Sequence, residues 1–542
     1  MRIIHALTSS AAALFAGVFQ ALSMADPWNG QPHGWLQVLS LAALIALLTR
    51  HAARNADGLS GAWVARPAWR RGLLLGWLFG LGWMAATFWW LFISMHTYGG
   101  LPAALAVAAV LALAGLLALF YAAACAVFAA LVPARLLARR PVLSLLAFAA
   151  LWTLAELARG RWFTGFPWGA GGYAHVDGVL SFLPRYVGVY GVGFVAAALA
   201  ALLVFGRQVR WRSARAVAGV AALLVLGAGL WAWRFCDVHL CHTPPAGTPR
   251  LVMDVALLQG NIPQDQKFVP GTGVADSLRW YGEQLRDARA TLVVAPETAL
   301  PLLPRDLPEG YWQALVDRFG EGGQAALMGV PLGDMAAGYT NSVVGFAPAL
   351  AQPYRYDKHH LVPFGEFIPP LFKWFTRMMN IPLGDFDRGG LNQAPLTWQG
   401  QRLAPNICYE DLFGEELAAR FADPARAPTA FVNVSNIGWF GDSVAIDQHL
   451  AISRMRALEF ERPMLRATNT GATAIINHRA EVTHQLPRMT RGVLLGQFEG
   501  RTQITPFARW AAYWSLWPLW GFCMGLVVLV WTVRRRVRPR LI

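Results

Sequence analysis

The feature that most restricts the fold of this chain is a series of long apolar stretches, because a helix needs about 20 apolar residues to cross the hydrocarbon layer of a bilayer. The stretches cover 5–25, 33–49, 72–95, 102–131, 142–158, 187–206, 214–234 and 511–533. The stretch 142–158 is the weakest, since Glu156 and Arg159 stand at its end. The pattern predicts a multi-pass α-helical membrane domain with about eight spans.

The overall composition agrees with membrane segments and excludes nucleic-acid binding. Hydrophobic residues make up 56% of the chain and charged residues only 14%. The formal net charge is +15, but the basic residues stand between apolar stretches and not on one folded face. Positive charge placed in this way is typical of the cytoplasmic loops of a membrane protein. We therefore expect a lipid bilayer as a partner and no nucleic acid.

The loops between the stretches differ strongly in positive charge. One set of flanks is rich in arginine: Arg2, Arg50, Arg54, Arg66, Arg70, Arg71, Arg135, Arg139, Arg140, Arg207, Arg210, Arg212, Arg215, Arg534, Arg535, Arg536, Arg538 and Arg540. The opposite set holds only Arg159, Arg161 and Arg185 in its connecting loops. Positive flanks stay in the cytoplasm, so both termini are predicted to be cytoplasmic. The predicted domains are a transmembrane domain of seven spans, an external domain, and a last span with a basic tail (1–234, 235–509 and 510–542).

The first stretch has a second interpretation. Arg2, the apolar run after it and the small residues from Ala21 to Ala25 are also typical of a secretory signal peptide. Cleavage there would leave the external placement of 235–509 unchanged, because the next span would then start from outside. The two possibilities differ in whether the mature protein keeps Met1 or begins near Ala25.

One loop on the predicted outer side, 162–168, is aromatic and uncharged. Aromatic side chains settle at the level of the lipid headgroups, so the loop is expected to anchor the chain at the interface. A further possibility is that Trp162 and Trp168 border an entrance for lipid.

In the external region, strand-like and helix-like stretches alternate. The sequence predicts strands over 252–258, 292–295, 325–330, 342–346 and 430–434, and helices over 274–289, 311–319 and 447–461. Alternation of this kind indicates layered α/β packing around sheets.

Three side chains of this region suggest covalent chemistry. Cys408 stands where a short apolar strand enters a turn, which is a suitable place for a nucleophile. Glu297 follows the strand 292–295 after Pro296, and Lys358 is the third member of the set. A thiol becomes a useful nucleophile when a base removes its proton and a nearby cation favours the thiolate.

The other cysteines are not expected to take part in the chemistry. Cys125 and Cys523 fall within apolar stretches and are expected to pack there. Cys236 and Cys241 stand just outside the seventh span, where an oxidising compartment permits a disulfide without requiring one. The cysteine and histidine spacing does not suit zinc, and we expect neither a metal nor a cofactor.

Four motifs carry a resemblance to known families: QGNIPQ from Gln259, PETALP from Pro296, KHHLVPFGEFIP from Lys358 and ICYED from Ile407. The ordered glutamate, lysine and cysteine resemble the nitrilase superfamily. The longer motifs resemble the apolipoprotein N-acyltransferase family of bacterial inner membranes, over 255–496. The resemblance implies an α/β nitrilase-like α-β-β-α sandwich, which periodicity alone does not predict, and a periplasmic location for it.

The resemblance also implies a role for each side chain. Glu297 would be the general base, and Cys408 would attack an ester carbonyl. Lys358 would stabilise the thiolate and the oxyanion that forms. Glu366 would orient Lys358 or balance its charge, and the backbone N–H of Tyr409 could supply a second oxyanion donor.

Other positions match the family less closely. Glu410, with its neighbour at 409, is expected to shape the acyl pocket, although a structural role is equally open. Ile437 stands where the family usually has an acidic residue, and Phe268 stands where relatives often carry Trp. Trp439 and Phe440 either line the acyl site or fill the core.

The segment 367–383 is very apolar and contains Trp374 and Phe375. Extended apolar exposure usually marks a contact with a partner. We expect this segment to dip into the outer leaflet and to act as a lid over the thiol; the alternative is a local hydrophobic cluster.

Together with the resemblance, these features imply an enzyme that transfers a fatty acyl chain from a membrane phospholipid, through a thioester on Cys408, to the α-amino group of the N-terminal diacylglyceryl-cysteine of an apolipoprotein. Two substrates that use one thiol in turn imply ping-pong kinetics. One alternative is a membrane-anchored nitrilase-type amidase with water as acceptor, which would need no apolar lid. The other is an inactive transporter or scaffold, which would not need the complete set of Glu297, Lys358 and Cys408.

Overall fold

The computed structural model describes residues 2–56, 68–206, 251–348, 350–368 and 386–537. The chain forms two compact units. The helical unit comprises Met1–Trp89, Ala109–Pro249 and Leu516–Ile542, and the sandwich unit comprises Trp90–Ala108 and Arg250–Ser515. The predicted span 214–234, the pair Cys236 and Cys241, and the lid residues Trp374 and Phe375 lie outside the described residues.

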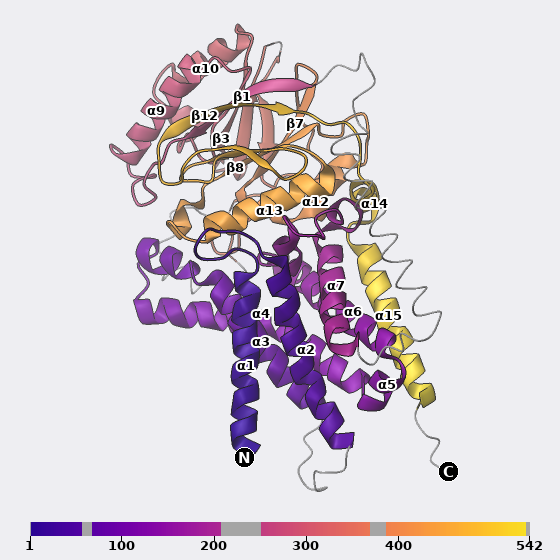
Figure 1. Cartoon of the computed structure of the whole chain (residues 1–542). Coiled ribbons are helices and arrows are strands. Elements are labelled where there is room, and N and C mark those ends of the chain that lie inside the picture. Colours follow the sequence, from indigo (N-terminus) through magenta and orange to yellow (C-terminus); the bar gives the residue numbers. More distant parts are fainter. Residues whose placement is uncertain (1, 57–67, 207–250, 349, 369–385, 538–542) are drawn as a thin grey trace. The chain divides into compact units, whose positions relative to one another are not determined.

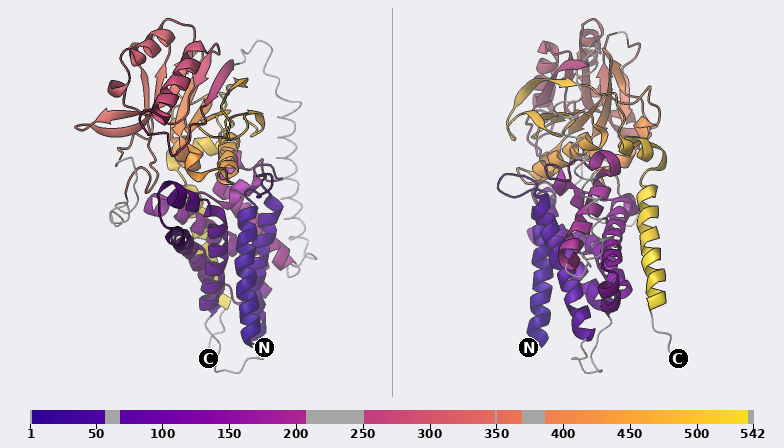
Figure 2. Two further views of the ribbon diagram at one scale, coloured as in Figure 1. Left: turned by 90° about the vertical axis from the view of Figure 1, so that its left-hand side faces the viewer. Right: turned by 45° about the vertical axis from the view of Figure 1, so that its right-hand side comes forward.

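The helical unit confirms a multi-pass helical membrane domain (Figures 1 and 2). Its helices are α1 (Arg2–Leu22), α2 (Gly34–Ala56), α3 (Ala68–Phe88), α4 (Ala103–Leu131), α5 (Ala134–Arg139), α6 (Pro141–Arg161), α7 (Pro184–Phe205) and α15 (Trp517–Val537). Within the described residues, four helices are long and apolar enough to cross a membrane: Ala103–Leu131, Pro141–Thr164, Pro184–Phe205 and Trp517–Arg536. Shorter apolar helices run over Leu7–Leu22 and Gly34–Thr49. The total of eight spans stays a prediction.

The third predicted span, 72–95, was wrong at its end. Helix α3 stops at Phe88, and a π-helical turn, η1 (Ile93–Tyr98), follows it. Residues Trp90–Ala108 belong to the sandwich unit. An apolar run alone does not distinguish a span from a segment that packs against a folded domain.

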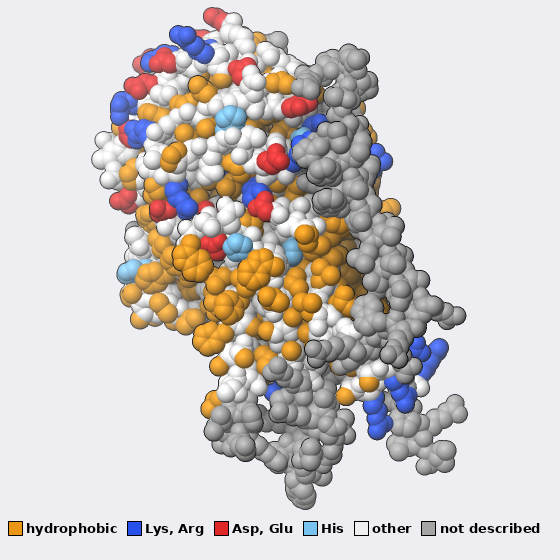
Figure 3. All heavy atoms as spheres, in the orientation of Figure 1, with side chains coloured by type: hydrophobic (Ala, Val, Ile, Leu, Met, Phe, Trp, Pro, Cys, Tyr) orange, Lys and Arg blue, Asp and Glu red, His pale blue; other side chains and the backbone are white. Residues whose placement is uncertain are grey.

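The surface of the helical unit is that of a membrane protein. Large apolar side chains are exposed along its helices, among them Phe15, Leu39, Leu74, Leu116 and Leu203. Figure 3 shows hydrophobic atoms gathered over the helices α1 to α3. A continuous apolar surface of this kind is stable against lipid tails and costly in water.

Two charged residues at the end of α6 hold the aromatic loop 162–168 and the segment directly after it. Arg159 is buried, and its Nη1 donates to the carbonyl oxygen of Trp168 at 2.7 Å. The buried Glu156 accepts the backbone N–H of Gly171 at 2.9 Å through Oε1. Trp162 is 55% exposed whereas Trp168 is buried. The two charges that weakened the prediction of this span therefore fix the backbone that follows it, Arg159 at Trp168 and Glu156 at Gly171.

The sandwich unit is built on two six-stranded sheets. The first has the order β12-β1-β2-β3-β4-β5: Gly492–Glu499, Val252–Gln259, Leu292–Val294, Ala325–Asp334, Gly338–Phe346 and Tyr354–Asp357. The second has the order β11-β10-β9-β8-β7-β6: Val482–Gln485, Ala474–Ile476, Met464–Thr468, Ala430–Ser435, Gln401–Ile407 and Leu396–Trp398. In each sheet three central strands are parallel, β1-β2-β3 and β9-β8-β7.

Helices cover the outer face of each sheet. They are α9 (Gly273–Asp287) and α10 (Tyr311–Gly320) on the first sheet, and α12 (Gly414–Ala418), α13 (Ala445–Phe460) and α14 (Pro506–Trp514) on the second (Figure 1). Alternate residues of β1 enter two different cores: Leu257 packs between the sheets, and Leu258 packs under α9. Strands buried on both faces appear in the sequence as continuous apolar runs. The α-β-β-α sandwich is thus confirmed.

Candidate active site

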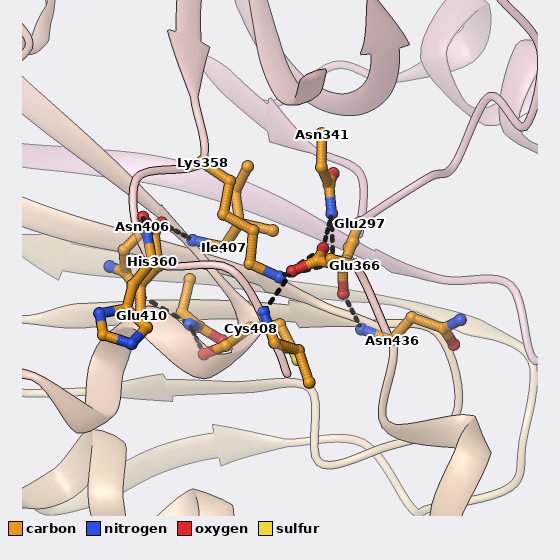
Figure 4. Close-up of polar contacts among 12 residues, drawn as sticks. Glu297, Asn341, Lys358, His360, Glu366, Asn406, Ile407, Cys408, Glu410 and Asn436 are labelled. Atoms are coloured by element: carbon orange, nitrogen blue, oxygen red, sulfur yellow. Dashed lines mark hydrogen bonds and ion pairs between the residues drawn. The ribbon is translucent and has the colours of Figure 1, made fainter. Parts of the chain in front are cut away.

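The predicted glutamate, lysine and cysteine follow strands of both sheets, and the fold brings them together (Figure 4). Glu297 follows β2 and Lys358 follows β5, both of the first sheet. Cys408 directly follows β7 of the second sheet. Because the carboxyl ends of parallel strands lie at the same edge of a sheet, side chains far apart in the sequence meet here.

A buried network of hydrogen bonds and ion pairs fixes the lysine. Lys358 Nζ lies 2.8 Å from Glu366 Oε1 and 3.4 Å from Glu297 Oε1. The Asn341 amide of β4 donates to both carboxylates, at 2.8 Å to Glu297 and 2.7 Å to Glu366. Glu366 also accepts the backbone N–H of Val362 at 2.8 Å. The structure thus brings Glu366 to the place that the sequence predicts, beside Lys358.

The charges of this network set the protonation of its members. Burial alone would lower the pKa of Lys358, but the carboxylates of Glu366 and Glu297 outweigh it and raise that pKa. Burial, together with the charge of Glu297, raises the pKa of the Cys408 thiol well above its usual value, and Lys358 opposes this shift. The site at rest therefore holds a permanent ammonium and a protonated thiol.

The backbone of Cys408 has the left-handed conformation, with φ of +50°, which is uncommon for a residue other than glycine. The turn η7 (Cys408–Leu412) begins at this residue. The adjacent carboxylate of Glu410 accepts the backbone N–H of Ile407 at 2.6 Å and that of His359 at 2.7 Å. It also accepts the hydroxyl of Tyr356 at 2.8 Å. Glu410 therefore ties the strand that carries the cysteine to the loop that carries the lysine.

Tyr409 and the segment after Asn436 lie around this centre. The Tyr409 side chain is buried, and its ring centroid lies 5.3 Å from that of Phe413. The backbone N–H of Asn436 donates to Glu297 Oε2 at 2.8 Å. Ile437, where the family usually has an acid, is buried.

The aromatic residues of the turn η9 (Ile437–Phe440) contact the segment that follows α3. The Trp90 and Phe440 rings lie 4.2 Å apart between centroids, and the Tyr98 and Trp439 rings lie 5.9 Å apart. Trp90 Nε1 also donates to Gln448 Oε1 at 3.1 Å. We call residues Trp90–Ala108 the strap, because this segment extends over η9 and α13 within the sandwich unit.

Sequence reasoning missed two polar residues of the site, Asn341 and Lys267. Lys267 is 1% exposed, and its Nζ donates to the backbone oxygen of Glu297 at 3.0 Å. Burial lowers the pKa of Lys267 to about 8, and the charge of Glu297 opposes this shift. Phe268, its neighbour, is partly exposed, with its ring 6.0 Å from this amine. The signal available was a single lysine three residues after the motif QGNIPQ that begins at Gln259.

Comparison with known proteins agrees with this architecture. Residues 16–202 match the apolipoprotein N-acyltransferase N-terminal domain, and residues 254–506 match the carbon-nitrogen hydrolase family. The chain is 59% identical over 521 residues to the apolipoprotein N-acyltransferase of Verminephrobacter eiseniae, which covers 93% of this chain and 92% of that relative. It is 47% identical over 507 residues to the apolipoprotein N-acyltransferase of Ralstonia nicotianae, with 93% and 90% covered.

A third relative, the apolipoprotein N-acyltransferase of Bordetella bronchiseptica, is 40% identical over 569 residues, with 97% of this chain and 96% of the relative covered. The similarity thus extends through both the helical unit and the sandwich unit. The chain belongs to the apolipoprotein N-acyltransferase family.

Proposed function

We propose that this chain transfers a fatty acyl chain from a membrane phospholipid to the α-amino group of the N-terminal diacylglyceryl-cysteine of an apolipoprotein. The observation that carries the proposal is the gathering of Glu297, Lys358 and Cys408 in one buried network, in a chain 59% identical to an apolipoprotein N-acyltransferase. The reaction needs a nucleophile, a base and a fixed positive charge. These three side chains provide them.

In the first half-reaction the thiol of Cys408 attacks the ester carbonyl of a phospholipid, and its proton passes to Glu297. The raised pKa of the thiol means that this proton leaves only during the attack. The ammonium of Lys358 stabilises the oxyanion, and the backbone N–H of Tyr409 is the second proposed donor. The intermediate then releases a lysophospholipid, whose alkoxide takes the proton from Glu297, and an acyl thioester remains.

In the second half-reaction the α-amine of the lipoprotein attacks the thioester. The amine must arrive without its extra proton, and it loses another to Glu297 as the C–N bond forms. The thiolate of Cys408 then leaves and recovers that proton, so the enzyme returns to its first state with an amide as product. Glu366 holds Lys358 in place during both steps, and Glu410 holds the turn that carries Cys408.

The membrane arrangement proposed for this reaction follows from the charge of the loops. Both termini lie in the cytoplasm of a bacterial inner membrane, with domain limits of 1–234, 235–509 and 510–542, and the catalytic region faces the periplasm. Donor and acceptor are both lipid-held, so a site at the outer leaflet meets both of them. Trp374 and Phe375 belong to the apolar segment that we propose as a lid.

Mass spectrometry tests the proposal directly. Full-length enzyme in phospholipid vesicles is expected to gain one acyl group on Cys408, and to lose it when a diacylglyceryl lipopeptide with a free α-amine is added. Cys408→Ala is expected to gain none. Cys523→Ala, which changes a buried cysteine of the helical unit, is the matched control and is expected to behave as the wild type.

Two other results would contradict the proposal in different ways. An adduct that is lost to water without a lipopeptide would indicate the amidase. A wild-type enzyme that forms no adduct at all would indicate an inactive scaffold.

A further inference from the structure

A second group of titratable side chains lies behind the nucleophile, and the mechanism above does not use it. Its members are fully buried: Asp411 of η7, His449 and Ser453 of α13, and Arg466 of β9. His449 Nε2 lies 3.2 Å from the carbonyl oxygen of Cys408 and 3.0 Å from Asp411 Oδ1. A cysteine, a histidine and an aspartate together suggest a catalytic triad in which histidine is the base.

The contacts of His449 decide against that role. Arg466 Nη2 lies 3.1 Å from His449 Nδ1. A guanidinium has only hydrogen-bond donors, so Nδ1 must present its lone pair to Arg466. The ring proton is therefore on Nε2, and the imidazole is neutral. Its single lone pair is already engaged, so His449 has no free site to receive a proton from the thiol.

The charges of Asp411 and Arg466 also favour a neutral His449 imidazole. Asp411 and Arg466 form an ion pair, with 3.5 Å between Oδ2 and Nη1, and both side chains are inaccessible to solvent. Ser453 donates to the same carboxylate. A second positive charge on His449 would lie uncompensated in this buried space, which is strongly unfavourable.

The N–H of Nε2 contacts the backbone of the nucleophile itself. The Nε2–H is shared between two acceptors, Asp411 Oδ1 at 3.0 Å and the carbonyl oxygen of Cys408 at 3.2 Å. The same carbonyl oxygen also accepts from the Asn433 amide of β8 at 3.3 Å. The two donors hold the residue whose φ of +50° is uncommon for cysteine. Holding that carbonyl restricts rotation about the Cα–C bond of Cys408, and this limits the positions that the sulfur can take.

We propose that His449 is a positioning residue for the nucleophile: its Nε2–H, set by Arg466, holds the carbonyl of Cys408 in the left-handed conformation, and it takes no proton from the thiol. This inference deepens the function proposed above, because it rests on Cys408 as the nucleophile.

Two substitutions separate positioning from base catalysis. The amide N–H of glutamine reaches the same region as histidine Nε2 and donates a hydrogen bond, but it does not act as a base. The rate of acyl addition to Cys408 of the full-length enzyme in phospholipid vesicles is measured by mass spectrometry across pH for each variant. We expect His449→Gln to stay within about tenfold of the wild type, with an unchanged pH profile, because the loss of a general base costs about 100-fold or more.

His449→Phe removes the donor while keeping a ring, and we expect the rate of acyl addition to fall by about 100-fold because the sulfur is misplaced. The same two substitutions at the exposed His484 are the matched controls, and both are expected to leave the rate unchanged. The thermal unfolding midpoint shows whether each variant is folded. If His449→Phe does not fold, the rate of the His449→Gln variant alone decides between positioning and base catalysis.

A folded His449→Gln variant whose rate of acyl addition falls by about 100-fold or more, as expected for loss of a general base, would overturn the proposal. A folded His449→Phe variant with the wild-type rate would overturn it too, since the carbonyl contact would then be dispensable. Both outcomes presuppose that the wild type forms the Cys408 adduct. A wild type without the adduct would instead overturn the function proposed above, and this inference with it.

Discussion

Lys267 completes the charge balance of the catalytic network. Glu297 and Glu366 carry two negative charges, and Lys358 carries one positive charge. Lys267, which donates a hydrogen bond to the backbone oxygen of Glu297, supplies the second positive charge. When the thiol proton passes to Glu297, the net charge of the group stays the same, so no unbalanced charge forms in a buried site. The second lysine thus favours the thiolate that attacks.

Replacement of Lys267 by Met is expected to slow acyl addition to Cys408 by about 10- to 100-fold, because the site then has one negative charge in excess. Lys267→Arg keeps the charge and should retain more of the rate. Mass spectrometry of the acyl adduct measures both rates. Arg279→Met, an exposed site, is the control. Equal rates for Lys267→Met and wild type would show that this charge has no part in the reaction.

The lowered pKa of Lys267 also predicts that the stability of the protein depends on pH. This pKa is about 8 in the folded protein, below the usual 10.5, because burial disfavours the charged amine. Between these two values the unfolded chain holds a proton that the folded chain has lost, so the contribution of Lys267 to stability rises with pH in this window. The thermal unfolding midpoint of Lys267→Met, compared with wild type from pH 7.5 to pH 10, should lack this rise. An identical pH dependence in both proteins would contradict the assignment.

At the scale of elements, the junction between β7 and η7 depends on one carboxylate. Glu410 accepts hydrogen bonds from Ile407 at the end of β7, and from Tyr356 and His359 at the end of β5. Both of its oxygens are used. The sequence left open whether this residue lines the pocket or is structural, and these contacts favour a structural role close to the nucleophile.

Glu410→Gln is expected to impair both stability and acyl addition. The amide group would point an N–H donor at a backbone N–H donor, which costs about 2 kcal/mol for a buried pair. We expect a lower unfolding midpoint and a loss of adduct on Cys408, measured as above. Glu283→Gln, on the partly exposed face of α9, is the matched control. A variant with wild-type stability would mean that water takes over one of the contacts.

Most elements of the sandwich could be predicted because their strands are buried on both faces. The predicted strand 252–258 and helix 447–461 correspond to β1 (Val252–Gln259) and α13 (Ala445–Phe460). The end of α3 could not be predicted, since aromatic residues such as Trp90 suit a membrane and a protein core equally well. The residue that Trp90 contacts decides between the two environments. That residue is Gln448, which lies far along the chain.

The site was predictable only where a motif marks it. Glu297, Lys358 and Cys408 stand in recognisable strings, and the fold brings them together. Asn341 and His449 are single polar residues within other elements, and nothing in their spacing shows which charges they meet. The charge of Lys358 lowers the pKa of the Cys408 thiol, but burial and the charge of Glu297 outweigh it, and a sequence does not show how deeply a side chain is buried.

At the scale of the whole molecule, the proposed orientation is open to a labelling test. Asp287→Cys in the sandwich unit and Arg139→Cys at the end of α5 are exposed positions. In a variant without its native cysteines, an impermeant maleimide should label Asp287→Cys in intact spheroplasts. Arg139→Cys should be labelled only after permeabilisation, because the arginine-rich flanks are cytoplasmic. The reverse pattern of labelling would contradict the orientation.

The strap makes the catalytic unit discontinuous in sequence, since its residues Trp90–Ala108 are separated from the rest by a large part of the helical unit. A ribosome therefore completes the strap long before it makes Gln448 and Phe440, the residues that the strap contacts. The strap therefore has to wait for these partners, and the catalytic unit is complete only when its later part has closed upon this earlier piece. A soluble fragment that starts after the helices would lack that piece from the outset.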